Sequence, residues 1–375
     1  MPEGHSVHRI ARRFDELFAG KPVRVTSPQG RFAAGAQRLD GRTVLRTIAV
    51  GKQMFMEFDG DLWLRVHLGI YGAWDFALRA GAGPDEVGAD ARGAAARAAD
   101  TAGADARGGD AVGAPHGGAA DPGERGSTER IGQTGEYSLP ARALDARRAR
   151  VERPASMGAP RRLRAGESET ELPGASGAGR GELEQEWPPE PIGAVRVRLL
   201  GAGACADLRG PTACEVLDAA QVDAVLAKLG PDPLVDGRAR GRRRFAAAVA
   251  KRRTPIGTLL MDQAVIAGIG NIYRAEMLFR AGISPFAPGS ALSAVQVDAL
   301  WDDWAKLLPI GVDTGVIVTR TGLRGRAKEA ALEHREERHW VYGRAGQPCR
   351  VCGTPIAMEL MQNRKLFWCP VCQQR

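Results

Sequence analysis

The residues best suited to chemistry lie at the two ends of the chain, and the clearest group is a set of four cysteines. Cys349, Cys352, Cys369 and Cys372 form two Cys-x2-Cys pairs with 16 residues between them. Two such pairs supply four thiolates to a tetrahedral zinc ion, although a pair of redox-active dithiols is the alternative. Because four protein ligands leave no open coordination position, this spacing predicts one structural Zn2+ in a rigid hairpin.

The second group is Pro2 and Glu3, which follow the initial methionine directly ahead of a predicted helix. Methionine is readily removed when proline follows it, and its removal leaves a secondary amine beside a carboxylate. An α-amino group has a pKa of roughly 7.7–8.0, so a useful fraction is unprotonated near neutral pH. The pair suits an amine nucleophile, but a dipeptide is a weak signal and position 2 can be arbitrary.

The third candidate is the sequence AGIGN, which interrupts two stretches with apolar residues at helical spacing. Gly268 and Gly270 permit a tight turn, and Asn271 can serve as the N-cap of the second helix. A helix N-terminus behind such a turn presents free N–H groups that suit a phosphate. Eight Lys and Arg residues between positions 238 and 253 favour backbone binding, with an ordinary turn and a solvated helix face as the alternatives.

The composition favours a nucleic-acid partner. The formal net charge of the 375 residues is +8, which points to a polyanion, with nucleic acid ahead of a membrane surface. The sequence has no run of about 20 apolar residues, and its charged first residues lack the apolar core of a signal peptide. We therefore expect a soluble cytoplasmic protein with no membrane partner, whose paired cysteines bind metal.

The elements that must position these residues follow from the spacing of apolar side chains. Six apolar residues recur on one face of residues 5–19, which predicts a helix that ends at Gly20. The remaining predicted elements are strands at 42–50, 53–58, 62–68 and 194–200, a hairpin turn at Asp59-Gly60, helices around 215–229, 259–266 and 272–280, further helical structure to about 309, and a C-terminal hairpin with a turn at 362–364.

Two stretches separate these elements. Residues 81–189 are mostly Gly, Ala, Arg, Asp and Glu, and Tyr137 is the only aromatic residue between Gly83 and Glu186. Such a segment cannot bury enough apolar surface to offset the entropy lost on ordering, so we interpret it as a disordered insertion. Residues 230–235, which contain two prolines and a glycine, are predicted to be a linker between domains.

Four motifs in this order resemble one family: MPEG at the start, Gly51-Lys52 on an early strand, LLMDQAVIAGIGNIYRAE, and a four-Cys hairpin that ends CPVCQ. The family is that of formamidopyrimidine-DNA glycosylase and endonuclease VIII, enzymes of base excision repair. The resemblance implies an α+β fold with an N-terminal helix, an antiparallel β-sandwich, a helix-two-turn-helix domain and a zinc-finger β-hairpin. The implied domains are a catalytic sandwich at 1–80 and 190–229, a helix-two-turn-helix domain at 236–340 and a zinc finger at 341–375.

Carried over by position, the resemblance implies that Pro2 is the nucleophile at sugar C1′ and Glu3 its acid–base partner. A secondary amine can form an iminium, which a hydroxyl nucleophile cannot, and the iminium acts as an electron sink for strand cleavage. Glu3 can protonate the sugar oxygen as the ring opens and then transfer the elimination protons. Lys52 matches a strand lysine that contacts a phosphate and assists β-elimination, although context alone favours an ordinary strand-edge lysine.

The same resemblance implies several DNA contacts. Asn271 matches a phosphate-binding asparagine, and Arg364 matches the zinc-finger arginine, which binds DNA at the catalytic site. Family members commonly have glycine where this chain has Asn363, which puts the local turn shape in question. Lys228 stands where the family often has a basic DNA contact.

A further loop matches the wedge that fills the gap left by an extruded base. Gly69, Ile70 and Tyr71, in HLGIYGAW, occupy this loop. Ile70 and Tyr71 supply an apolar and an aromatic side chain, whereas Gly69 lacks the polar side chain of the endonuclease VIII branch. The alternative is that these are core residues at the end of a strand.

We therefore predict a bifunctional DNA glycosylase and abasic-site lyase that removes oxidised bases by Schiff-base chemistry at Pro2, followed by β,δ-elimination. The MPEGH start and the contiguous wedge loop favour oxidised pyrimidines. Oxidised purines are the alternative substrates, and a non-catalytic zinc-finger DNA-binding protein is the alternative class. The implied partner is damaged double-stranded DNA, bound by a monomer in the nucleoid of the cytoplasm without an obligate protein partner.

Overall fold

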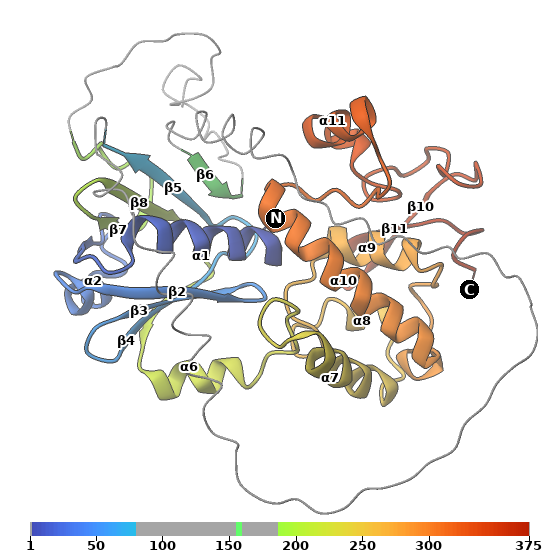
Figure 1. The fold of residues 1–375 in the computed structure, drawn as a ribbon, viewed down its shortest axis with the longest axis horizontal. Coiled ribbons are helices and arrows are strands. Elements are labelled where there is room, and N and C mark those ends of the chain that lie inside the picture. The colour runs from blue at the N-terminus through green and yellow to red at the C-terminus, as the bar shows by residue number, and fades with distance from the viewer. Residues whose placement is uncertain (1, 80–154, 160–186, 375) are drawn as a thin grey trace, which may run out of the picture. The chain divides into compact units, whose positions relative to one another are not determined.

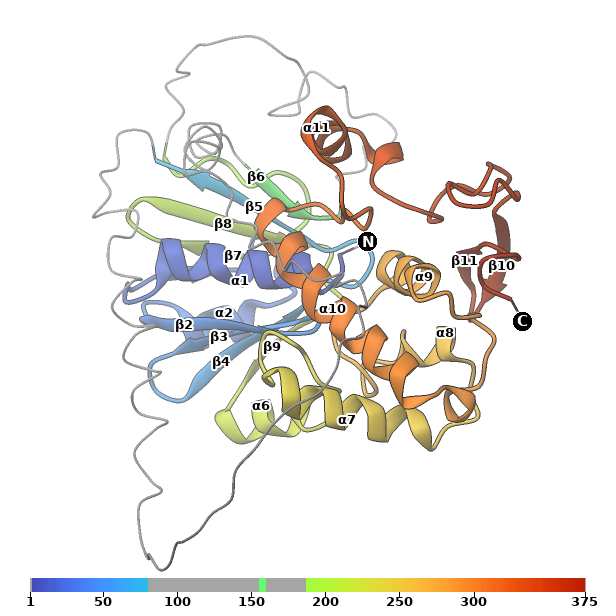
Figure 2. The same cartoon turned by 45° about the vertical axis from the view of Figure 1, so that its right-hand side comes forward.

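The structure, a computed structural model, describes residues 2–79, 155–159 and 187–374. Its first part consists of two antiparallel β-sheets with helix α1 (Gly4–Phe18) between them, and its second part consists of helices and a small hairpin (Figures 1 and 2). Most of the predicted insertion lies outside the described residues. The predicted fold class, an α+β chain with a β-sandwich, a helical domain and a C-terminal hairpin, is confirmed.

Every strand pairing in the two large sheets of the described chain is antiparallel. The five-stranded sheet has the order β1-β7-β8-β5-β6, and the four-stranded sheet has the order β2-β3-β4-β9. The strands are β1 (Arg24–Thr26), β2 (Val44–Val50), β3 (Gln53–Phe58), β4 (Leu62–His67), β5 (Ala73–Leu78), β6 (Ala155–Gly158), β7 (Val195–Leu200), β8 (Ala204–Arg209) and β9 (Ala213–Leu217), and a short helix α2 (Ala33–Leu39) follows β1.

Helix α1 forms because its apolar residues repeat at helical spacing and are buried on one face. Val7, Ile10 and Phe14 of this face are all at most 2% exposed. Gly20 follows the helix with φ +74, a left-handed conformation that glycine adopts without strain, so the predicted helix and its end are confirmed. The helix therefore holds the first residues of the chain in a fixed place.

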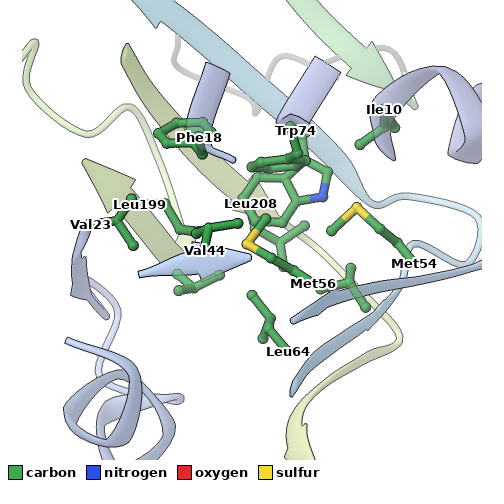
Figure 3. Packing of buried hydrophobic residues seen from close by; sticks show 14 of the residues in the cluster. Ile10, Phe18, Val23, Val44, Met54, Met56, Leu64, Trp74, Leu199 and Leu208 are labelled. Carbon is green, nitrogen blue, oxygen red and sulfur yellow. The ribbon is translucent and has the colours of Figure 1, made fainter. Parts of the chain in front are cut away.

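The sandwich core unites both sheets with α1. Figure 3 shows Trp74 from one sheet facing Met54 and Met56 from the other. The Trp74 indole is fully buried and meets the Phe14 ring edge-on, with 4.6 Å between the ring centroids. Burying one such large side chain stabilises the fold by roughly 1.5–3 kcal/mol, so this core fixes the sheets that carry the turns of the candidate site.

Two sequence predictions need correction in this sandwich. Residues 215–217, predicted to begin a helix, belong instead to β9, which pairs with β4 from Trp63–Leu217 to His67–Ala213. The helix α6 (Ala219–Leu226) begins only at Asp218, whose side chain and that of Gln221 form a capping box. The residues before Asp218 join the sheet because Cys214 and Val216 pack against the sandwich core.

The second correction concerns the predicted insertion. Residues 155–158, which lie within the predicted disordered insertion, form the edge strand β6 against β5. Met157 pairs with Trp74 and packs against the sandwich core, which explains why a segment of poor composition still joins the sheet.

The second part of the chain is helical. Its helices are α7 (Arg238–Ala250), α8 (Ile256–Leu259), α9 (Asn271–Arg280), α10 (Ala294–Thr314) and α11 (Gly325–Glu333), with 3-10 turns η2 (Gly289–Ala291) and η3 (Arg335–Glu337). Trp301 and Trp304 of α10 are fully buried in its core, together with Phe245 of α7. No helix among the described residues is long and apolar enough to cross a membrane.

The predicted linker, 230–235, is anchored inside the fold. Asp232 is fully buried, and its Oδ2 accepts hydrogen bonds from His8 Nε2 at 2.8 Å and from the Gly51 N–H at 2.7 Å. Its Oδ1 accepts from the Leu234 N–H at 2.9 Å. One carboxylate therefore ties α1, the turn between β2 and β3, and the segment that leads to α7.

The C-terminal hairpin consists of β10 (Ala357–Met361) and β11 (Arg364–Trp368), paired from Ala357–Trp368 to Met361–Arg364. Its turn residues Gln362 and Asn363 have φ values of 51 and 58, the left-handed pair of a tight hairpin turn. Asparagine tolerates this conformation better than most residues, so Asn363 fits the turn although it is not glycine.

Candidate active site

Glu3 lies at the N-terminus of α9 and is only 1% exposed. Its Oε2 accepts a hydrogen bond from the Gly270 N–H at 2.8 Å, and its Oε1 accepts one from the Ile272 N–H at 2.8 Å. Burial raises the pKa of Glu3, while the charge of Lys52 and these N–H donors act in the opposite direction. Glu3 is therefore a carboxyl group that retains a proton more readily than an exposed glutamate.

This contact corrects the prediction of free N–H groups ready for a phosphate. The first amides of α9 donate to Glu3, a residue that is 267 positions away from Gly270. The N-cap is Gly270 rather than Asn271, which is the first residue of the helix. The Asn271 side chain donates from Nδ2 to the Lys365 carbonyl at 2.7 Å, so it fixes the hairpin to α9.

Lys52 reaches the same place from the turn between β2 and β3. Its Nζ donates to the Ile269 carbonyl at 2.6 Å, just before the amide that binds Glu3. Burial lowers the pKa of Lys52 to about 8, with the charge of Glu3 opposing this shift and that of Arg364 adding to it. Lys52 is thus mostly protonated at neutral pH but close to its titration.

Pro2, the residue before Glu3, is buried. Gly4, the residue after Glu3, is also held in place, because its N–H donates to the Gly268 carbonyl at 2.8 Å. Burial lowers the pKa of His5 to about 3, and the charge of Arg9 lowers it further, so this imidazole is neutral. The start of the chain is therefore held against the Gly-rich turn that bears Glu3's hydrogen-bond donors.

Cations surround this carboxylate. Arg364 begins β11, and its charge lowers the pKa of both Lys52 and Arg274. Arg274 is fully buried on α9 and donates to Asn271 Oδ1. Burial lowers the pKa of Arg274 to about 10, with Glu3 opposing. Lys52 and Arg274 lie beside Glu3, Arg364 lies beside these two cations, and such a group suits a site for an anionic ligand.

Sequence reasoning missed two members of this group. Arg274 follows Asn271 by three positions, which places both on one helix face, and that spacing could have identified it. His67 ends β4 opposite Gln53, beside Lys52. Burial lowers the pKa of His67, and the neighbouring Lys52 charge lowers it further. Only the strand register brings His67 to Lys52.

The predicted wedge residues lie in the loop between β4 and β5. Ile70 is 43% exposed and Tyr71 is 64% exposed, which excludes the interpretation that both are core residues. Gly69 has φ +64 and bends the chain out of β4. Exposed neighbouring apolar side chains on a basic protein are suited to insertion into a partner.

Lys228 is not brought to the candidate site by any described contact. It is exposed after the end of α6, and within the described chain no hydrogen bond or ion pair joins its ammonium to Glu3, Lys52 or Asn271. Its predicted DNA contact therefore stays a prediction.

The four cysteines of the hairpin region come together. One ligand atom from each of Cys349, Cys352, Cys369 and Cys372 lies within 4.8 Å of the others, with Sγ–Sγ distances of 3.9 Å and 3.4 Å for two of the pairs. Zn–S bonds of about 2.3 Å would set tetrahedral S–S distances of about 3.8 Å. The cluster therefore fits one structural metal ion.

Helix α9 supports this hairpin region through Glu276, which is fully buried. Its carboxylate accepts hydrogen bonds from the N–H groups of Trp340, Val341 and Tyr342, at 2.7, 2.8 and 2.8 Å. The same helix receives Glu3 at its N-terminus and the Asn271–Lys365 bond on its side. The candidate site and the cysteine cluster thus share one support.

Comparison with known proteins gives a consistent result. Family models match at residues 1–106 (formamidopyrimidine-DNA glycosylase N-terminal domain), 229–322 (formamidopyrimidine-DNA glycosylase H2TH domain) and 346–375 (zinc finger found in FPG and IleRS). Endonuclease 8 1 of Mycobacterium tuberculosis is 34% identical over 374 residues, covering 100% of both chains. Formamidopyrimidine-DNA glycosylase of Geobacillus kaustophilus is 38% identical over 40% of this chain and 53% of its own length.

Solved structures share the fold. The MutM (Fpg) protein from Thermus thermophilus superposes with a TM-score of 0.58 at 21% identity, covering 99% of this chain and 98% of that one. A Lactococcus lactis Fpg mutant in complex with Fapy-dG containing DNA gives a TM-score of 0.59 at 18% identity, with 100% of both chains covered.

Proposed function

This chain belongs to the formamidopyrimidine-DNA glycosylase and endonuclease VIII family, and we propose that it excises oxidised bases through a covalent intermediate at Pro2. As a member of this family, it is a DNA glycosylase and abasic-site lyase of base excision repair. The observation that supports Pro2 as the nucleophile is the buried Glu3 carboxyl group beside it, which is held by α9 and faced by Lys52.

The proposed reaction begins at the Pro2 amine. Its nitrogen forms a bond to sugar C1′ as the C1′–base bond breaks, and the base leaves with the proton that the amine nitrogen releases. Glu3, whose pKa is raised by burial, gives its proton to O4′ as the ring opens to the iminium. The iminium accepts electrons when C2′ loses a proton, which expels the 3′ phosphate; a second elimination expels the 5′ phosphate.

Lys52, Asn271 and Arg364 are proposed to hold the backbone at the lesion. Lys52 is largely protonated at neutral pH, and Arg364 is the neighbouring cation. The loop of Gly69, Ile70 and Tyr71 is proposed to fill the gap left by the extruded base, because its large side chains are exposed. Lys228 is proposed as a more distant contact to DNA.

Trapping tests the proposed nucleophile. Borohydride reduction of the reaction on duplex DNA should yield a covalent protein–DNA adduct, and peptide mapping should locate it at Pro2. A tag fused to the N-terminus should abolish the adduct, whereas the same tag at the C-terminus should leave it. Full trapping by the N-terminally tagged protein would refute the nucleophile. A complete lack of trapping and cleavage would instead favour the non-catalytic DNA-binding alternative.

Oxidised pyrimidines are proposed as the preferred lesions. The support is the contiguous loop of Ile70 and Tyr71 together with the full-length similarity to a protein named Endonuclease 8 1. Cleavage of a panel of duplexes, each with a single oxidised pyrimidine or purine, tests this preference. Faster excision of formamidopyrimidine or 8-oxoguanine would assign the alternative substrate class.

The structural metal is proposed to be one zinc ion, held by Cys349, Cys352, Cys369 and Cys372. When bound, it would cross-link the two loops that carry the hairpin. Metal analysis should find about one equivalent of zinc in the wild type and much less in Cys369→Ser. Cys214→Ala, which alters a cysteine of β9 outside the cluster, is the matched control and should retain the metal.

The partner is proposed to be damaged duplex DNA, bound by one copy of the chain in the cytoplasm at the nucleoid. Light scattering of the free protein and of its complex with a lesion duplex measures both masses, which tests whether one copy of the chain binds the duplex.

A further inference from the structure

One peptide group links the two central side chains of the proposed site. The carbonyl of Ile269 accepts from Lys52 Nζ at 2.6 Å, and the N–H of Gly270, on the other side of the same peptide bond, donates to Glu3 Oε2 at 2.8 Å. No direct ion pair joins Lys52 to Glu3 in the part of the chain that the structure describes. Charge on either side chain therefore polarises the bond to the other through this peptide.

Gln263 holds the same peptide from a third side. Its Nε2 donates to the Ile269 carbonyl at 3.1 Å, and its Oε1 accepts from the Gly268 N–H at 2.9 Å. Nε2 also donates to the Met261 carbonyl at 3.1 Å. Because two carbonyls and one N–H surround the amide, its orientation follows from the hydrogen bonds themselves. Gln263 and Lys52 thus share one acceptor oxygen.

We infer that Gln263 is a positioning residue of the lyase reaction, which sets how strongly Lys52 is bound to the Ile269–Gly270 peptide and hence how Lys52 and Glu3 are coupled. A carbonyl oxygen that already accepts from the Gln263 amide is a weaker acceptor for the Lys52 ammonium. Gln263 therefore favours release of the Lys52 proton and keeps the peptide N–H directed at Glu3. This inference rests on the proposed function of Lys52 and Glu3.

Other charged groups also face Lys52. Glu3 approaches from the start of the chain, Arg364 from β11 and His67 from β4, and Arg274 of α9 lies beside Glu3 and Arg364. None of these side chains changes in a Gln263 variant. A shift in the titration of Lys52 on replacing Gln263 is therefore attributable to the shared carbonyl.

The direct test is the titration of Lys52 by NMR. The chain contains seven lysines, so selective labelling gives few signals, and the Lys52 signal is identified by its loss in Lys52→Met. Gln263→Met keeps the length of the side chain but removes the competing donor. It should raise the titration midpoint of Lys52 by roughly half a pH unit to one unit, the scale of one hydrogen bond.

A second variant keeps the test decisive if Gln263→Met folds poorly. Gln263→Leu also removes the donor to the Ile269 carbonyl and adds no charge, so it should raise the Lys52 midpoint by the same roughly half to one pH unit. An unchanged or lowered midpoint in either folded variant would overturn the inference.

The matched control is Gln296→Met, which removes a glutamine that only forms the capping box of α10 with Ser293. It should lower the melting temperature and leave the Lys52 midpoint unchanged. The pH profile of cleavage at a preformed abasic site should shift in the same direction as the midpoint in the Gln263 variants. If the wild type cleaves no abasic DNA, the proposed function fails while the NMR titration still tests the role of Gln263.

Discussion

The position of Glu3 at the start of α9 affects both the helix and the pKa of its own carboxyl group. Its carboxylate caps α9, where the helix dipole and the N–H donors of Gly270, Ile272 and Tyr273 favour negative charge. Burial favours the neutral form instead and is the larger effect, so the pKa of Glu3 is raised. The same carboxyl group therefore accepts hydrogen bonds from the start of the helix and holds a proton more readily than an exposed glutamate.

The close approach of Glu3 depends on Gly270. A Cβ atom at Gly270 would lie 2.3 Å from Glu3 Cδ, so Gly270→Ala must displace the carboxylate. We expect excision to fall by on the order of 100-fold or more, because general acid–base catalysis contributes at least that much. The measurement is single-turnover excision. Gly201→Ala is the control, since a Cβ there lies 3.4 Å from the Phe18 ring, and its excision rate should match the wild type.

The stability of the protein should report the titration of Lys52. Its pKa in the fold is about 8, against 10.5 in an exposed lysine. The unfolded chain therefore binds one more proton between these values, and stability must rise with pH across this range. Relative to Lys52→Met, the wild type should gain up to about 3 kcal/mol in unfolding free energy from pH 8 to 10.5. Urea titrations at several pH values measure this difference. A difference that stays constant with pH would contradict the lowered pKa of Lys52.

Residue types at the site were predictable from sequence, but their partners were not. Pro2, Glu3 and Lys52 follow from a motif, and the cysteine spacing alone identified a metal cluster that the structure brings together. The occupation of the α9 amides by Glu3 has no local signal, because the two partners are 267 residues apart. Arg274 and His67 were missed because their proximity to the site depends on helix phase and strand register.

At the scale of elements, the segment 230–235 behaves as a structural junction. Asp232 is fully buried and accepts from His8, the Gly51 N–H and the Leu234 N–H. Gly51 immediately precedes Lys52, so the carboxylate that joins these elements also fixes the turn that carries the lysine. The prolines and the glycine of this segment predicted a break between domains. The contacts of Asp232 with His8 and Gly51 hold the segment in place, and they could not be predicted from the local sequence.

Removal of this carboxylate should be costly. Asp232→Ala leaves His8 and the Gly51 N–H buried without their acceptor, and we expect a loss of about 3 kcal/mol in unfolding free energy. Asp313→Ala is the control, because its ion pair with Arg12 has both side chains more than half exposed and should cost less than about 1 kcal/mol. Equal effects of the two substitutions in urea titrations would argue against the junction.

The elements that sequence patterns missed are those decided by packing. Helix α1 and the first three strands of the four-stranded sheet were predicted nearly to the residue, whereas β1, α2, β5 and β8 were not predicted. The helix predicted at 259–266 is also wrong, because α8 ends at Leu259 and turns follow it. Strand β9 was mistaken for the start of a helix because five residues carry little periodicity. Strand β6 was missed because its support is the register of Met157 opposite Trp74.

At the scale of the whole molecule, phosphate contacts and base extrusion should be separable. Arg364→Ala should weaken binding to all duplexes by a similar factor and reduce the log–log salt slope by about one. Tyr71→Ala should slow excision with little change of slope, because it removes an exposed wedge and no charge. Binding titrations at several salt concentrations measure both.

The control for this comparison is Arg24→Ala. Arg24 is an arginine of β1 whose side chain is 75% exposed, and its replacement should not change the log–log salt slope. An unchanged slope in Arg364→Ala would remove Arg364 from the phosphate contacts.

Helix α9 connects the candidate active site to the cysteine cluster. It holds Glu3 at one end, Lys365 through Asn271, and the approach to the cysteine cluster through Glu276. Reciprocity of binding free energies then requires that whatever factor the metal adds to DNA affinity, DNA adds to metal affinity. If metal binding strengthens the proposed DNA binding, DNA bound at the candidate site should lower the fraction of metal that a chelator removes, and the DNA-free enzyme should lose its metal first.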